Sequence, residues 1–221
     1  MEEYLKPTEF IESENPKISK LAREIVKGER DSRKRTRRLF YFVRDQISFR
    51  PIFFNYLPKE EFKATVTLRR GYGFCLMKAV LLISFLRSLK IPSRLVLAEI
   101  RHHQLPERVK EGLKSKSNVI PHGFAEAFLG KKWIKLNPTF DLSYCDAMDY
   151  FPTEFDGEKN ALFPSVDRKG RKLIDYLDII GRYKDFPYNF FLDYLREKYG
   201  TLDTLFFSDV NKGETFYKGW S

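Results

Sequence analysis

Two strand-like segments separated by only two residues restrict the possible fold more than any other feature of this chain. They are residues 122–129 and 132–137, and Gly130-Lys131 lies between them, with glycine in the first position of the turn. This pattern is typical of a β-hairpin with a two-residue turn, which fixes the register of the two strands. A slip of one residue would move every side chain to the opposite face. The sequence therefore predicts an antiparallel sheet.

The predicted register brings two polar side chains together at the far end of the hairpin. It places Phe124 opposite Asn137, and His122 lies two residues from Phe124 on the same strand, so His122 and Phe124 share a face. Asn137 is then a diagonal neighbour of His122, at about 7–8 Å between backbones, which is within reach of the side chains. We expect the Asn137 side-chain oxygen to accept an N–H from the imidazole of His122.

Cys75 stands at the start of a predicted helix. Gly71 and Gly73 precede it and allow the backbone to turn sharply, and the apolar residues after it recur at helical spacing. The first turn of a helix offers unpaired N–H groups and a positive dipole end, which favour a thiolate, and Arg69 and Arg70 are expected to add to this effect.

These three residues have the chemistry of a thiol acyl-transfer enzyme. Cys75 would be the nucleophile, His122 the base, and Asn137 the group that fixes the direction of the His122 ring. We expect a resting thiolate–imidazolium pair, for which a neutral amide is a sufficient third member. Cys145 lacks such a context and is predicted to be buried, while His102 and His103 have no comparable partner and could be surface residues.

The order of predicted elements indicates an α+β fold, in which a Cys-bearing helix packs on an antiparallel sheet. Helices are expected at about residues 16–27, 32–47 and 190–199, with the Cys75 helix ending at Ile91-Pro92 and a central strand at residues 95–100. The segment after Pro138 is aromatic and predicted to be rich in loops.

No repeat or Ser/Gly linker divides the chain. We expect a single domain at residues 1–221, with the motif-bearing core at 64–141, N-terminal helices within 15–47 and a loop-rich C-terminal extension at 142–221.

The charge of the chain is strongly positive. Forty Lys and Arg residues against thirty Asp and Glu give a formal net charge of +10, and the densest cluster is Arg30 to Arg38. An apolar series at helical spacing follows this cluster directly, so the arginines are interpreted as the solvated face of a helix, and nucleic-acid binding is the minor alternative.

The chain contains no apolar window long enough for a membrane span, and its acidic start lacks the core of a secretory signal. The protein is expected to be soluble and cytoplasmic, with no membrane partner. Two cysteines cannot form a disulfide framework.

Around these residues the sequence resembles the transglutaminase-like superfamily of papain-like thiol enzymes. The separation between His122 and Asn137 is the one that the family uses between its base and its third catalytic member. The matching segments are Arg70-Gly71-Tyr72-Gly73-Phe74-Cys75 with Ala79 and Ile91-Pro92, then His122-Gly123-Phe124-Ala125-Glu126, then Lys132-Trp133-Ile134-Lys135-Leu136-Asn137-Pro138-Thr139.

The resemblance implies a papain-like α+β fold and thiol-dependent acyl transfer on peptide or glutamine side-chain amides, by hydrolysis or by a transglutaminase reaction. The family usually has Asp where this chain has Asn137, so Asp141, four residues later, is an alternative orienting group. The chain lacks an Asp-rich calcium loop, which favours hydrolysis and predicts no cofactor or metal. The expected partner is a peptide or protein with an accessible amide. A catalytically inactive module that holds a peptide in the same fold is the alternative function.

Overall fold

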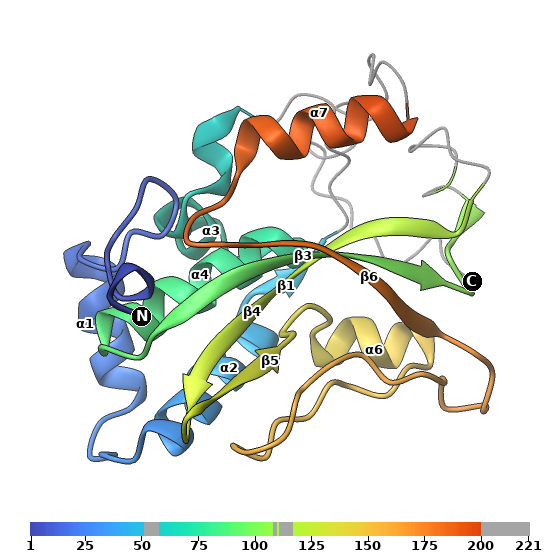
Figure 1. Cartoon of the computed structure of the whole chain (residues 1–221). Helices are drawn as coiled ribbons and strands as arrows, with labels where there is room; N and C mark the ends of the chain where they lie inside the picture. The colour runs from blue at the N-terminus through green and yellow to red at the C-terminus, as the bar shows by residue number, and fades with distance from the viewer. Residues whose placement is uncertain (51–57, 108–109, 111–116, 200–221) are drawn as a thin grey trace.

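The computed structural model describes residues 1–50, 58–107, 110 and 117–199. A four-stranded antiparallel sheet in the order β5-β4-β3-β6 forms its centre (Figure 1). The strands are β3 (Ser93–His102), β4 (Val119–Leu129), β5 (Lys132–Leu136) and β6 (Ile174–Tyr183). A short parallel pair, β1 (Ser48–Phe49) and β2 (Tyr72–Gly73), lies outside this sheet.

Helices cover both faces of the sheet. Helix α7 (Tyr188–Tyr199) lies above the sheet in Figure 1 and α6 (Leu142–Met148) lies below it. The other helices are η1 (Glu2–Tyr4), α1 (Pro16–Ile25), α2 (Ser32–Gln46), η2 (Lys59–Phe62), α3 (Ala64–Arg70) and α4 (Cys75–Ser88). This mixture of helices and antiparallel strands confirms the predicted α+β class.

Each face of the sheet has its own hydrophobic core. The larger core joins α1, α2, α4 and α7 to the inward face of β3 and β4, where Leu95, Leu97 and Ala125 are buried. A smaller aromatic cluster packs α6 against Ile100 and Ile174 on the other face. Because side chains alternate along a strand, residues of β4 point in turn to the α4 core and to the aromatic cluster.

The hairpin has the predicted register. Leu129 pairs with Lys132, Phe128 with Trp133, and Ala125 with Leu136. The two turn residues have positive φ angles, 56° at Gly130 and 67° at Lys131, which is the geometry of a type I′ turn. The ladder ends at Leu136, so the expected pair of Phe124 with Asn137 does not form.

The helices before the sheet begin and end close to their predicted positions. The Asn15 side chain caps α1 by accepting an N–H from Lys17, and Pro16 is the first helical residue. The Asp31 side chain caps α2 in the same way. A capping side chain followed by an apolar stripe, as found at both of these ends, is typical of helix starts.

The prediction for the second half of the chain is wrong in one important respect. The segment expected to be a loop-rich extension contains α6 and the ten-residue strand β6, which pairs with β3 along the sheet. Leu177 and Ile179 on β6 are exposed, and the pairing with β3 has register shifts. An edge strand with apolar residues on both faces lacks the alternation by which strands are recognised in sequence. Residues 200–221 of the expected C-terminal extension lie outside the described residues.

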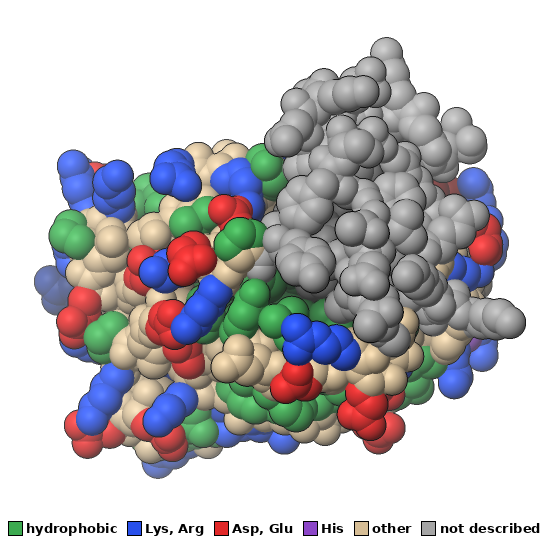
Figure 2. Space-filling view, turned by 90° about the horizontal axis from the view of Figure 1, so that it is seen from above, with side chains coloured by type: hydrophobic (Ala, Val, Ile, Leu, Met, Phe, Trp, Pro, Cys, Tyr) green, Lys and Arg blue, Asp and Glu red, His purple; other side chains and the backbone are tan. Residues whose placement is uncertain are grey.

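The arginines of the Arg30–Arg38 cluster make contacts within the chain. Arg33 forms an ion pair with Glu158 at 2.6 Å, and the guanidinium groups of Arg35 and Arg38 donate to the backbone oxygens of Glu29 and Lys27. These contacts agree with a solvated helix face. On the face seen in Figure 2, acidic and basic side chains are interspersed.

No helix within the described part of the chain is long and apolar enough to cross a membrane.

Candidate active site

The backbone before Cys75 is folded tightly by two glycines. Gly71 ends α3 with a φ angle of 74°, a left-handed conformation that glycine adopts without strain. Gly73 then pairs with Phe49 between β2 and β1, and a Cβ atom at Gly73 would lie 3.0 Å from the Cβ of Met77. Helix α4 begins at Cys75 itself, which places the sulfur at the helix start as predicted.

A third glycine allows the start of α4 to approach β4. A Cβ atom at Gly123 would lie 2.2 Å from Cδ2 and 2.9 Å from Cγ of Leu76, so no larger residue fits without movement. The backbone N–H of Gly123 also acts on the Cys75 sulfur as a hydrogen-bond donor. Because Gly123 directly follows His122, this contact places the Cys75 sulfur beside the strand segment that carries His122.

Cys75 is partly exposed, whereas the residues of α4 that follow it, Leu76 to Arg87, are buried. Burial raises the pKa of the Cys75 thiol to about 11, although N–H groups of Gly123, Leu76 and Cys75 act in the opposite direction. Loss of water around the sulfur therefore outweighs the donors at the helix start. The thiol is the resting form in this conformation.

His122 is buried among aromatic rings on the face of the sheet that points to the smaller cluster. Its ring centroid lies 5.0 Å from that of Phe163 and 6.1 Å from that of Tyr176. Among the described residues its Nε2 atom has no hydrogen-bond partner of regular geometry. Burial lowers the pKa of His122 to about 3, while the side chain of Asn137 acts to raise it.

The expected thiolate–imidazolium pair is therefore wrong for the resting structure. The apolar surroundings disfavour the charged form of both groups, so the thiol and the imidazole are each neutral. The sequence shows the helix start and its dipole, but it does not show how completely the fold removes water from the two side chains.

Asn137 reaches His122 by leaving the hairpin. Its backbone N–H donates to the backbone oxygen of Ala161 at 2.9 Å, in place of the β4 partner. Its side chain is fully buried and fixed at both ends: Oδ1 accepts from the Thr139 hydroxyl at 2.5 Å, and Nδ2 donates to the Tyr176 hydroxyl at 3.1 Å. Asn137 is thus next to His122, as predicted, with two further partners.

Asp141, the alternative orienting group, is used elsewhere. Its Oδ1 accepts the backbone N–H of Tyr144 and caps α6, and its Oδ2 accepts the backbone N–H of Phe49. Both carboxylate oxygens therefore hold backbone segments together. Asn137, not Asp141, acts on His122.

The remaining cysteine and histidines lie outside this cluster. Cys145 is fully buried, as predicted. His102 is buried rather than exposed, with Nδ1 lacking a partner among the described residues. His103 does have a partner, since its Nε2 lies 2.6 Å from the carboxylate of Asp175 on β6.

Two residues of the site were not singled out from sequence. Tyr176 lies on β6, a strand that was not predicted, and Phe163 lies in the connection before it. Nothing in the local sequence connects either residue to His122, because their contacts with it depend on the pairing of β6 with β3. In the described residues no group of three or more His, Cys, Asp or Glu side chains is arranged to hold a metal ion.

Comparison with protein families agrees with this arrangement. A model described as the transglutaminase-like superfamily matches residues 19–138, more than half of the chain, and includes Cys75, His122 and Asn137. The chain belongs to the transglutaminase-like superfamily. No curated protein matches it.

The similar solved structures share little sequence identity with this chain. A protein from Cytophaga hutchinsonii, whose description as a cysteine protease is provisional, is 15% identical with a TM-score of 0.48. The match covers 81% of this chain and 53% of that one, so the chain spans about half the length of the other protein. A protein described as a TGase is 14% identical with a TM-score of 0.38, covering 58% of this chain and 31% of the other.

Proposed function

We propose that this transglutaminase-like protein is a thiol-dependent acyl-transfer enzyme that acts on peptide or glutamine side-chain amides. Cys75 is the nucleophile, His122 the general base and acid, and Asn137 the group that orients His122. The observation that carries the proposal is the contact of the Cys75 sulfur, at the start of α4, with the backbone N–H of the residue after His122.

In the first half of the reaction, the Cys75 sulfur attacks the carbonyl carbon of the amide while its proton moves to the imidazole of His122. A C–S bond forms and the carbonyl oxygen becomes an oxyanion. His122 then gives the proton to the amide nitrogen, the C–N bond breaks, and an amine leaves. The product on the enzyme is a thioester at Cys75.

In the second half, His122 accepts a proton from water or from a primary amine as that molecule attacks the thioester. Water gives a carboxylic acid, and an amine gives a new amide. The returned proton restores the Cys75 thiol. The N–H groups of Gly123 and of the α4 start, which act on the sulfur, would stabilise the negative charge that develops near it.

The neutral resting state is compatible with this chemistry. A proton transfer from thiol to imidazole creates both charges together, and two opposite charges attract strongly where water is excluded. The raised pKa of Cys75 and the lowered pKa of His122 each oppose ionisation. The proton transfer from Cys75 to His122 is therefore expected to accompany attack on the substrate rather than to precede it.

Alkylation of the two cysteines with iodoacetamide tests the proposal. Cys75 is partly exposed and Cys145 is fully buried, so Cys75 should react first, and its rate should rise as the pH approaches about 11. His122→Ala should slow the reaction of Cys75 near neutral pH. His103→Ala is the matched control, because His103 is paired with Asp175, and it should have no effect. Equal, slow labelling of both cysteines would contradict the proposal.

One observation favours a second function, a catalytically inactive module that holds a peptide. The pKa values of Cys75 and His122 are both displaced toward the neutral forms, as would be expected of residues that no longer react. In that case Cys75→Ser should leave every binding property intact, and no thioester should form with any glutamine peptide. A mass increase on Cys75 after incubation with such peptides would exclude this alternative.

A further inference from the structure

A tyrosine outside the family segment contacts the third member of the proposed triad. Tyr176 lies on β6, beyond residues 19–138, and is half-buried. Its hydroxyl oxygen accepts the Nδ2–H of Asn137 at 3.1 Å and the backbone N–H of Phe163 at 3.4 Å. The ring also packs edge-on against Phe124, the neighbour of His122 on the same face of β4.

The side-chain amide of Asn137 has two ends of similar shape and opposite function. Rotation by half a turn would exchange the oxygen, which can accept an N–H from His122, for an NH₂ group, which cannot. A neutral amide can therefore serve His122 in only one of its two orientations. A carboxylate, which the family usually has at this position, has two equivalent oxygens and no such requirement.

We propose that Tyr176 is a positioning residue whose phenol oxygen, by accepting the Nδ2–H of Asn137, holds the amide with its oxygen available to His122. This inference rests on the proposed function and extends it to a residue of β6. Thr139 acts at the other end of the amide, since its hydroxyl donates to Oδ1 at 2.5 Å. Together the two hydroxyl groups distinguish the oxygen of Asn137 from its nitrogen.

The Tyr176 hydroxyl offers its oxygen, and not its proton, to Asn137. Both contacts of the oxygen are with N–H donors, so neither uses the phenol proton. Burial keeps the pKa of Tyr176 above its usual value, so the phenol retains its proton. The hydroxyl oxygen faces the NH₂ group of Asn137, and this contact favours the orientation that leaves the amide oxygen to His122.

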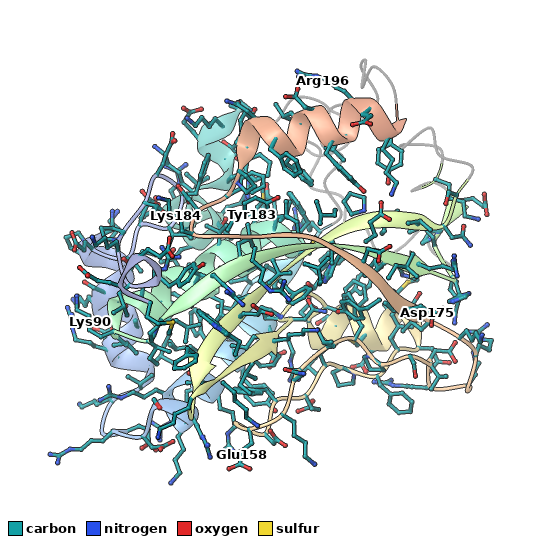
Figure 3. All side chains as sticks on the ribbon, in the orientation of Figure 1. Lys90, Glu158, Asp175, Tyr183, Lys184 and Arg196 are labelled. Atoms are coloured by element: carbon teal, nitrogen blue, oxygen red, sulfur yellow. The ribbon has the colours of Figure 1, made fainter. Side chains whose placement is uncertain are left out.

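Tyr176→Phe removes the hydroxyl and keeps the ring in the aromatic cluster, and it tests the inference. Two quantities are measured: the tautomer ratio of His122 by nitrogen NMR of protein labelled at its three histidines, and the rate of Cys75 alkylation near neutral pH. We expect the wild type to show one tautomer and Tyr176→Phe to show a mixture. Alkylation should be about tenfold slower, as for the loss of one buried hydrogen bond. Tyr183→Phe on the same strand is the control and should match the wild type. Figure 3 labels Tyr183 near one end of β6 and Asp175 near the other.

Tyr176→Phe in an Asn137→Asp background separates the orienting of the side chain at position 137 from the packing of the Tyr176 ring. A carboxylate needs no orientation, so Tyr176→Phe should change the His122 tautomer and the alkylation rate much less there than in the wild-type background. Equal effects in both backgrounds, or no effect of Tyr176→Phe on either quantity, would overturn the inference. The tautomer ratio is measured without substrate, so it remains informative even if His122→Ala shows that His122 does not assist Cys75 and the proposed function fails.

Discussion

At the scale of single residues, water exclusion determines the state of the site. The helix start and the surrounding N–H groups favour a thiolate at Cys75, yet burial raises its pKa to about 11. The same effect lowers the pKa of His122 to about 3, against the contribution of Asn137. The two displacements have one cause, the cost of placing a charge among apolar groups.

The buried neutral histidine gives stability a definite dependence on pH. The pKa of His122 is lower in the folded protein than in the unfolded chain, so the unfolded chain binds more protons below about pH 6.5. The contribution of His122 is complete above that pH and is lost as the pH falls toward 3. At pH 5 it corresponds to about 2 kcal/mol of lost unfolding free energy.

Urea unfolding at pH 7.5 and pH 5 measures this dependence. His122→Gln should remove about 2 kcal/mol of the difference between the two pH values. His102, whose pKa burial lowers to about 4, should make a separate contribution of similar size, so His102→Gln serves for comparison. An unchanged difference in His122→Gln would mean that His122 is solvated and free to take up a proton.

Replacement of Asn137 by the acid usual in the family should change the charge state of the pair. In Asn137→Asp a carboxylate stands beside His122, which favours the imidazolium and raises the pKa of His122. A protonated His122 in turn favours the thiolate of Cys75. Alkylation of Cys75 at pH 7 should become about tenfold faster or more, because an opposite charge within about 4–6 Å shifts the pKa of a group by about 1–3 units.

The control for this variant is Asn137→Ala, which removes the polar group and should slow alkylation. If Asn137→Asp and Asn137→Ala have the same effect, the side chain at position 137 does not act on His122 through its charge or its hydrogen bonds.

At the scale of elements, the close packing of α4 on β4 brings Cys75, the proposed nucleophile, to the strand that carries His122, the proposed base. The contact depends on Gly123, because a Cβ atom there would overlap the side chain of Leu76. This packing also explains why a glycine follows His122 in the sequence. The start of α4 passes over β4 at Gly123, where a side chain would not fit.

Gly123→Ala should therefore push the first turn of α4 away from β4. We expect a loss of about 1–3 kcal/mol in unfolding free energy, as for overpacking of a core, and slower assistance of Cys75 by His122. Leu76→Ala removes the overlapping atoms, so the added effect of Gly123→Ala should be smaller in that background. Independent, additive effects of the two substitutions would show that the strand and helix do not meet there.

A buried lysine ties α4 to α2. Lys78, one turn after Cys75, donates to the backbone oxygens of Arg44 at 3.0 Å and Ile47 at 2.6 Å. Burial lowers its pKa to about 7, partly offset by the charge of Asp141. The unfolded chain thus binds more protons between pH 7 and about 10.5, and stability should rise with pH across this range.

Lys78→Met removes the titrating group while it keeps an unbranched side chain in the core. Unfolding in urea at pH 7 and pH 9 should show a smaller rise of stability in Lys78→Met than in the wild type. Lys90→Met, at an exposed position after α4, is the control and should keep the rise. A rise of the same size in Lys78→Met would place its origin in another group.

Prediction from sequence succeeded for elements whose signals are local. The register of the hairpin follows from Gly130-Lys131, and the start of α4 follows from the glycines before Cys75. Strand β6 has no such signal: Leu177 and Ile179 are exposed at the sheet edge, and pairing with β3 determines its position. Tyr176 was missed for the same reason, whereas Asn137 was found through the hairpin.

At the scale of the whole molecule, the site lies where the sheet is partly uncovered. Strand β5 pairs with β4 only from Ala125 to Leu129, so within the described residues the remainder of β4 has β3 as its strand partner. His122 and Gly123 lie in this remainder. The α4 start approaches there with Cys75, and the chain after β5 brings Asn137, so three separate segments meet at the end of the hairpin.

The proposed pair of Cys75 and His122 depends on both faces of the sheet. Cys75 belongs to the larger core that includes α4, while His122 packs in the aromatic cluster on the other face with Phe163 and Tyr176. The two cores meet at β4. The pair is therefore held by the order of the sheet rather than by any one local motif.

Detection of a thioester on Cys75 tests whether this residue is the nucleophile of an acyl-transfer reaction. The intact protein is incubated with glutamine-containing peptides, with and without a primary amine, and the masses of protein and peptides are followed. We expect an acyl group on Cys75, its absence in Cys75→Ser, and its slow formation in His122→Ala, with a free acid or an amine adduct as product. Unchanged masses for the wild-type protein and all peptides, under conditions in which Cys75 is alkylated by iodoacetamide, would contradict it.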